Sequence, residues 1–139
     1  MRIFISYKFT GVPKSTLNNT VTILISILKR AGYEVFCNLE RDDEYVHKKW
    51  SAKEIMTECF NELEKCDYHI TFVAPNGKMG EGMLIELGYA KKMNLPTLLL
   101  FPRDYPSISA KAVVDKFIIY QNMSDLLSRI VPEIRGNSG

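Results

Sequence analysis

The sequence lacks any apolar run long enough to cross a bilayer, and it has few cysteines. Its longest apolar segments, VTILISIL and PTLLLF, are well short of the ~20 residues that a membrane-spanning helix needs. Three cysteines, Cys37, Cys59 and Cys66, without a CxxC spacing indicate buried thiols rather than disulfides or a zinc site. Met1 leads directly into the strand-like RIFIS, so no signal peptide is expected. We therefore predict a soluble, cytoplasmic protein without a membrane partner.

Strong charge and phosphate-binding motifs are also missing. The net charge is only +2 and the basic residues are scattered, which argues against a nucleic-acid partner. No Gly-x-Gly-x-x-Gly follows the first apolar run and there is no P-loop, which disfavours dinucleotide binding and ordinary NTPase chemistry. The acidic stretch ERDDEYVH (40–47) fits no standard metal spacing, so we expect a solvated loop, or a lid, rather than a metal site. No cofactor or metal is expected.

The chain instead contains apolar strands that alternate with helical patterns. At 139 residues and 46% apolar composition it fits one domain, residues 1–135, followed by a loose tail at 136–139. Periodicity predicts strands at 2–6, 33–36, 68–74, 96–101 and 116–120. It predicts helices at 16–31, 82–94 and 124–131, and a further helix that begins with a Ser51-x-x-Glu54 capping box.

This alternation predicts an α/β fold, a three-layer sandwich with a five-stranded parallel sheet in the flavodoxin/Rossmann-like order 2-1-3-4-5. In such sheets, ligands bind at the carboxyl ends of the strands where the strand order reverses, here between the first and third strands. Three loops, 6–11, 74–82 and 102–109, are expected to converge there.

A single acid, Glu86, lies within the apolar stretch GMLIELGYA of the helix that follows the second of these loops. Gly82 allows a tight turn, which leaves the free N–H groups of the first helical turn directed into the crevice. We expect the positive end of the helix to keep the pKa of Glu86 low, which suits a nucleophile. The alternative is an exposed helix glutamate with no role.

The stretch resembles the signature of the nucleoside 2-deoxyribosyltransferases and the related nucleoside 5′-monophosphate N-glycosidases. That signature is a Gly, three variable residues and then Glu-(Leu/Ile)-Gly-Tyr-Ala, and Gly82 and Glu86–Ala90 match it. The resemblance implies that Glu86 attacks C1′ of the sugar, expels the base and forms an ester that water or a second base resolves. It also implies a nucleoside or nucleotide substrate and a homodimer or larger homo-oligomer.

Several positions depart from the family pattern. A tyrosine on the first strand, whose hydroxyl touches the nucleophile, is replaced by Phe4, which we expect to pack against the sugar or base. The aspartate that the family usually has eight residues before Asp67, the Asp that opens the third strand, is replaced by Cys59. Its neighbour Glu58 is a candidate second catalytic acid, or else a solvated helix acid. The position six residues before the nucleophile, commonly Asp or Ser, is Gly80.

Three further residues are candidates for substrate binding. Lys8 in the first loop could pair with a phosphate, or could be a surface lysine. The backbone N–H of Met83, beside that of Gly82, could hold the sugar or its phosphate. SISAK (107–111) resembles the LSAM segment of the monophosphate hydrolases. There a serine, matched by Ser109, reaches the phosphate in a neighbouring subunit's site. The alternative is that these residues simply begin a short helix.

A second interpretation comes from a different functional class. RIFISYKF also resembles the opening FISY box of TIR domains, which share the architecture and either assemble with partners or cleave NAD. The Glu-Leu-Gly-Tyr-Ala segment is not a feature of TIR domains. We therefore rank a TIR-like signalling domain second.

Overall fold

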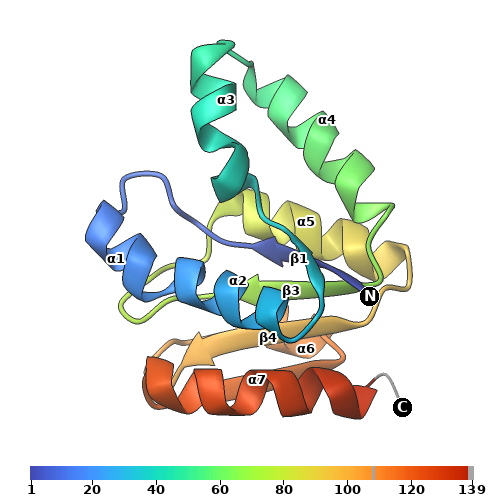
Figure 1. The fold of residues 1–139 in the computed structure, drawn as a ribbon. Helices are drawn as coiled ribbons and strands as arrows, with labels where there is room; N and C mark the ends of the chain where they lie inside the picture. Colours follow the sequence, from blue (N-terminus) through green and yellow to red (C-terminus); the bar gives the residue numbers. More distant parts are fainter. Residues whose placement is uncertain (108, 138–139) are drawn as a thin grey trace.

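A computed structural model describes residues 1–107 and 109–137 and contains one parallel sheet. Its strand order is β2-β1-β3-β4-β5, which confirms the predicted order and the α/β sandwich (Figure 1). The strands are β1 (Arg2–Ser6), β2 (Glu34–Phe36), β3 (Tyr68–Phe72), β4 (Thr97–Pro102) and β5 (Lys116–Tyr120). All four neighbouring pairs are parallel.

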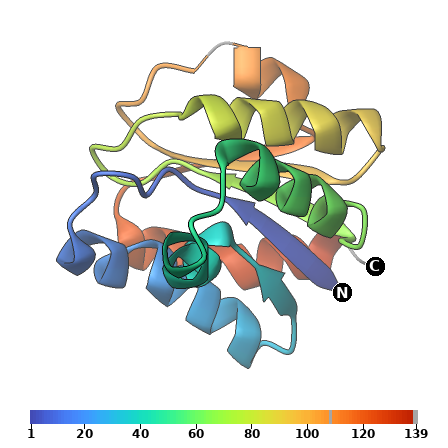
Figure 2. The same cartoon turned by 90° about the horizontal axis from the view of Figure 1, so that it is seen from above.

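Helices cover both faces of this sheet. They are α1 (Lys14–Asn19), α2 (Val21–Arg30), α3 (Asp42–His47), α4 (Ala52–Leu63), α5 (Glu81–Lys92), α6 (Ser109–Val113) and α7 (Met123–Asn137), with a 3-10 turn, η1 (Asn38–Arg41). Figure 2 shows α5 and α6 on one side of the strands and α1, α2 and α7 on the other. None of the helices in the described ranges combines the length and the apolar character needed to span a membrane.

Alternation along β1 assigns side chains to the two faces. Ile3 and Ile5 belong to the core beneath α2 and α7, whereas Phe4 belongs to the cluster beneath α4 and α5. Because side chains alternate along a strand, Ser6 lies on the same face as Phe4. The last residues of β1 therefore direct a polar side chain toward α5.

The predicted helix over 16–31 is wrong in one respect, because the structure divides it at Thr20. Thr20 has φ −126° and ψ −95°, which separates α1 from α2. Its buried hydroxyl donates to the carbonyl of Thr16 and lies 3.2 Å from the hydroxyl of Tyr7. Local hydrogen bonding of this kind competes with the helical ladder.

The expected charged loop after β2 is also wrong, because it forms η1 and α3. Asp42, Asp43 and Glu44 lie in the first turn of α3, where acids favour a helix through its dipole. The capping box at Ser51 is present, with Ser51 Oγ accepting from the Glu54 N–H at 3.1 Å, and α4 begins there. Figure 1 shows α3 and α4 extending beyond the edge of the sheet.

At the C-terminus, α7 continues past the predicted end at residue 131. Its buried Ile130 and Ile134 keep helical spacing across Pro132. Residues 136 and 137 of the expected loose tail therefore belong to the helix, and residues 138–139 lie outside the described part of the chain.

Candidate active site

Glu86 lies on α5 and faces the end of β1. Only 5% of its surface is exposed, although it is an acid within a helix. Its Oε1 accepts a hydrogen bond of 2.7 Å from the Ser6 hydroxyl, at the last residue of β1. Glu86 is therefore not the exposed helix glutamate of the alternative interpretation. It lies at the reversal of strand order, between β1 and β3.

A pocket of about 350 Å³ opens above Glu86. The loop after β1 contributes one wall, the N-terminus of α5 a second, and the segment after β2 together with α4 a third. The lining residues are Tyr7, Lys8, Phe9, Thr10, Asn38, Asp42, Tyr45, Ile55, Met56, Gly80, Glu81, Gly82, Met83 and Glu86.

The expected convergence of three loops is correct for two of them. The loop after β1 and the end of segment 74–82 both reach this pocket. Residues 102–106 of the third segment instead border a separate pocket with residues 75–77, because β4 lies one strand beyond the reversal of strand order. The segment after β2 borders the Glu86 pocket instead, because β2 is the neighbour of β1 on the side away from β3. Sequence analysis missed Asn38 and Asp42 for this reason.

The expectation of a low pKa for Glu86 is wrong. Burial raises the pKa of this carboxyl, against the opposing effect of hydrogen bonds from Ser6 and Cys59. The side chain is in the second turn of α5 and is enclosed by β1 and α4, so loss of hydration outweighs the hydrogen bonds that favour the charged form. A raised pKa means that the ionised form is held at a cost in folding free energy.

Two polar groups beneath Glu86 complete its surroundings. Ser6 Oγ lies 2.8 Å from Nε2 of His69, a fully buried residue of β3. Burial lowers the pKa of His69 to about 3, so the imidazole is neutral at pH 7. On the α4 side, the Cys59 thiol forms a hydrogen bond with Glu86, and burial raises the pKa of this thiol. Nδ2 of Asn38 lies 3.8 Å from the Cys59 sulfur.

Phe4 does not line the pocket. It is 1% exposed and packs in the cluster beneath α4 and α5, with ring centroids 5.2 Å from Phe36 and 5.7 Å from His69. The expected contact between Phe4 and the sugar or base is therefore not available on this surface. The polar residue of β1 near Glu86 is Ser6, two positions further along the same face.

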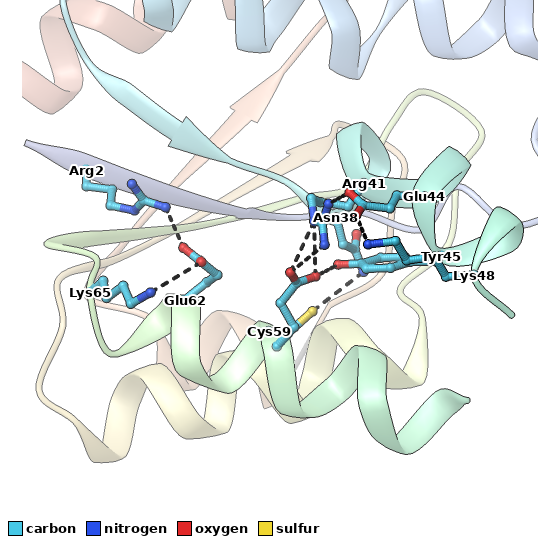
Figure 3. Close-up of polar contacts among 10 residues, drawn as sticks. Arg2, Asn38, Arg41, Glu44, Tyr45, Lys48, Cys59, Glu62 and Lys65 are labelled. Atoms are coloured by element: carbon cyan, nitrogen blue, oxygen red, sulfur yellow. Dashed lines mark hydrogen bonds and ion pairs between the residues drawn. The ribbon is translucent and has the colours of Figure 1, made fainter. Parts of the chain in front are cut away.

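Glu58 is engaged elsewhere. Its carboxylate accepts hydrogen bonds from Arg41 Nε and Nη2 and from the Tyr45 hydroxyl. Figure 3 shows Arg41 and Tyr45 directed from α3 and its preceding turn toward α4. Glu58 is not among the lining residues of the pocket, so it joins α3 to α4 and is not placed to serve as a second catalytic acid.

The remaining predicted residues divide into two groups. Lys8, Gly82 and Met83 line the pocket. The aliphatic part of Lys8 crosses Gly80, where an added Cβ would lie 3.4 Å from it in van der Waals contact. Ser109 is exposed at the start of α6 and is not among the lining residues of its own chain's pocket.

Comparison with known proteins assigns the chain to a family. The family model described as nucleoside 2-deoxyribosyltransferase matches residues 13–123. The chain belongs to this family. The protein is accordingly an enzyme of N-glycosidic bond cleavage or base transfer, and the match favours this interpretation over a TIR-like domain. No curated protein matches the sequence.

Solved structures share the fold of this nucleoside 2-deoxyribosyltransferase family member. The CMP N-glycosidase BcmB of Clostridium botulinum superposes with a TM-score of 0.68 at 21% identity, over 95% of this chain and 99% of that one. A 2-deoxyribosyltransferase of Bacillus psychrosaccharolyticus has a TM-score of 0.68 at 16% identity, over 91% and 90%. A conserved protein of Enterococcus faecalis reaches 0.70 at 12% identity, over 95% and 98%.

No group of three metal-ligating side chains occurs among residues 1–107 and 109–137. The polar groups available at the site are therefore the Glu86 carboxylate, the hydroxyl and amide groups near it, the Lys8 ammonium and the N–H groups at the start of α5.

We predict that Glu86→Gln raises the melting temperature at neutral pH. The folded-state pKa of Glu86 lies above its ordinary value of 4.5, so the folded protein binds more protons than the unfolded chain between the two values. The ionised carboxylate then destabilises the fold above that window, whereas the neutral amide does not. Below pH 4.5 the difference should shrink.

Thermal unfolding from pH 4 to pH 8 measures this effect. The exposed Glu81 at the start of the same helix provides the matched control, because Glu81→Gln loses a favourable dipole contact and should not stabilise. A Glu86→Gln protein that melts below the wild type at pH 7 would contradict the prediction.

Proposed function

We propose that the enzyme breaks the N-glycosidic bond of a nucleoside or nucleoside 5′-monophosphate with Glu86 as the nucleophile. The observation that carries the proposal is a buried carboxylate at the floor of a pocket, oriented by a hydroxyl and placed where parallel sheets bind ligands. The pocket is large enough for a sugar and part of a base, and open enough for the base to leave.

In the proposed reaction, a carboxylate oxygen of Glu86 bonds to C1′ while the C1′–N bond breaks. The base leaves with the bonding electron pair and takes up a proton. Attack of water on C1′ then releases the sugar and restores the carboxylate, or a second base attacks instead, and either route retains configuration. Asn38 and Asp42, on the wall formed by the segment after β2, provide hydrogen-bonding groups for the base.

Glu86→Ala should lower the release of free base by about 10³-fold or more while the protein stays folded. Chromatography of reactions with a panel of nucleosides and 5′-monophosphates measures the rate. Glu58→Gln is the matched control, since Glu58 joins α3 to α4. It should lower the melting temperature and leave the rate within about tenfold. Equal release by wild type and Glu86→Ala on every substrate would refute the proposed nucleophile.

The 5′ substituent of the sugar is proposed to lie between Lys8 and the first turn of α5. The backbone N–H groups of Gly82 and Met83 belong to the turn that leaves N–H groups without helical partners. Together with the Lys8 ammonium they favour a phosphate. Lys8→Met should raise KM for monophosphates about tenfold and change KM for the matching nucleosides little. An equal change for both substrate classes would place Lys8 away from the phosphate.

The enzyme is further proposed to work as a homodimer or larger homo-oligomer. Leu84 and Ile85, on the outer face of α5, are 49% and 46% exposed, and a second copy covering that face would remove them from water. A neighbouring copy could then supply Ser109 to the phosphate. Sedimentation should give at least twice the chain mass of 15.9 kDa, and Leu84→Glu should reduce it. A monomeric wild type at micromolar concentration would exclude this assembly.

A further inference from the structure

We propose that His69 and Ser6 are positioning residues that act on Glu86 through one directional chain, in which His69 Nε2–H donates to Ser6 Oγ and Ser6 O–H donates to Glu86 Oε1. The proposal rests on the proposed function, because it assigns a purpose to the orientation of Glu86. It concerns residues that make no contact with substrate. Neither is among the residues that line the pocket.

The direction of the chain follows from counting protons. Ser6 Oγ lies 2.7 Å from Glu86 Oε1 and 2.8 Å from His69 Nε2, and a serine hydroxyl carries one proton. An ionised carboxylate can only accept, so Ser6 donates to Glu86. Ser6 Oγ must then accept from the imidazole, which places the proton of His69 on Nε2.

The other nitrogen of His69 supports this tautomer. Nδ1 is fully buried and has no hydrogen-bond partner among the described residues. A protonated imidazole would bury an unpaired N–H together with a charge, whereas the Nε2–H tautomer leaves only a lone pair unpaired. The imidazole is therefore a fixed, neutral donor. Its neutrality agrees with the low pKa that burial gives it.

The strands hold the two groups in place. β1 and β3 are parallel neighbours, with Phe4 paired to His69 and Ser6 paired to Thr71. His69 and Ser6 thus lie diagonally on one face of the sheet, beneath Glu86. Both are at most 1% exposed and belong to central strands. Burying two polar residues at such positions costs folding free energy unless they are hydrogen-bonded. Here His69 is hydrogen-bonded to Ser6, and Ser6 is hydrogen-bonded to Glu86.

Other groups face Glu86 from the elements around it. The Cys59 thiol of α4 bonds to it, and the Cys37 thiol at the end of β2 interacts with it electrostatically. Lys8, Tyr7, Asp42, Tyr45 and Glu81 line the pocket with it. A thiol is a weak donor, so Ser6 is the strong hydrogen-bond donor to this carboxylate within the described residues. Its loss should leave Glu86 less ionised and less firmly oriented.

The test combines kinetics with direct titration of Glu86. Ser6→Ala should lower kcat by about 10- to 100-fold with little change in KM, because a charge-assisted hydrogen bond to the reacting group is lost. The acid limb of its pH–rate profile should move to higher pH. Ser6→Thr keeps a hydroxyl and should recover most of the rate.

The His69 variants test whether the imidazole acts through Ser6. His69→Val removes the donor and should shift the acid limb in the same direction as Ser6→Ala, but by less. His69→Gln provides an amide N–H and should restore the limb. The double variant Ser6→Ala/His69→Val should cost no more in kcat than Ser6→Ala alone. If the losses in kcat are additive, or if the variants melt at lower temperature without any shift of the acid limb, then both residues have only a structural role.

A measurement that needs no turnover separates this proposal from the proposed function. Carboxyl carbon NMR of glutamate-labelled protein, with Glu86→Gln to assign the signal, reports the Glu86 titration in wild type and Ser6→Ala. A higher midpoint in Ser6→Ala supports the chain even if no base is released from any substrate, in which case only the proposed function fails. An unchanged midpoint overturns the chain whatever the activity.

Discussion

The site depends on one costly constraint, a carboxylate that is kept almost out of water. Glu86 is 5% exposed and its pKa is raised by burial, so its ionised form is stabilised mainly by the groups that face it. The Ser6 hydroxyl provides the firmest of these contacts at 2.7 Å. Groups whose pKa is shifted by burial are concentrated at functional sites of proteins. The remaining architecture positions β1, α4 and α5 around this carboxylate.

Sheet topology explains why the carboxylate can be both buried and accessible. From β1 the chain moves outward to β2, and it then returns across the sheet to β3. The segments that leave β1 and β3 therefore diverge, and a pocket opens between them. The segment after β2, together with α4, forms the third wall, because Asn38, Asp42, Tyr45, Ile55 and Met56 line the pocket. The contacts of Glu58 with Arg41 and Tyr45 hold that wall together.

Sequence reasoning succeeded where local pattern determines the structure. Strand order and the position of Glu86 at the first-to-third strand boundary follow from alternating periodicity and one short motif. It failed where the answer depended on distant partners. The role of Glu58 is decided by Arg41, 17 residues away. The direction of the Glu86 pKa shift is decided by burial beneath β1 and α4, which a helix-dipole argument does not include.

The substitution of a first-strand tyrosine by Phe4 has a geometric answer in this chain. The resemblance implies a hydroxyl beside the nucleophile, and Phe4 provides none. Side chains repeat every two residues along a strand face, so Ser6 occupies the next position on the same face and its shorter side chain reaches Glu86 at 2.7 Å. The hydroxyl is thus moved by one repeat, and Phe4 becomes core beneath α4 and α5.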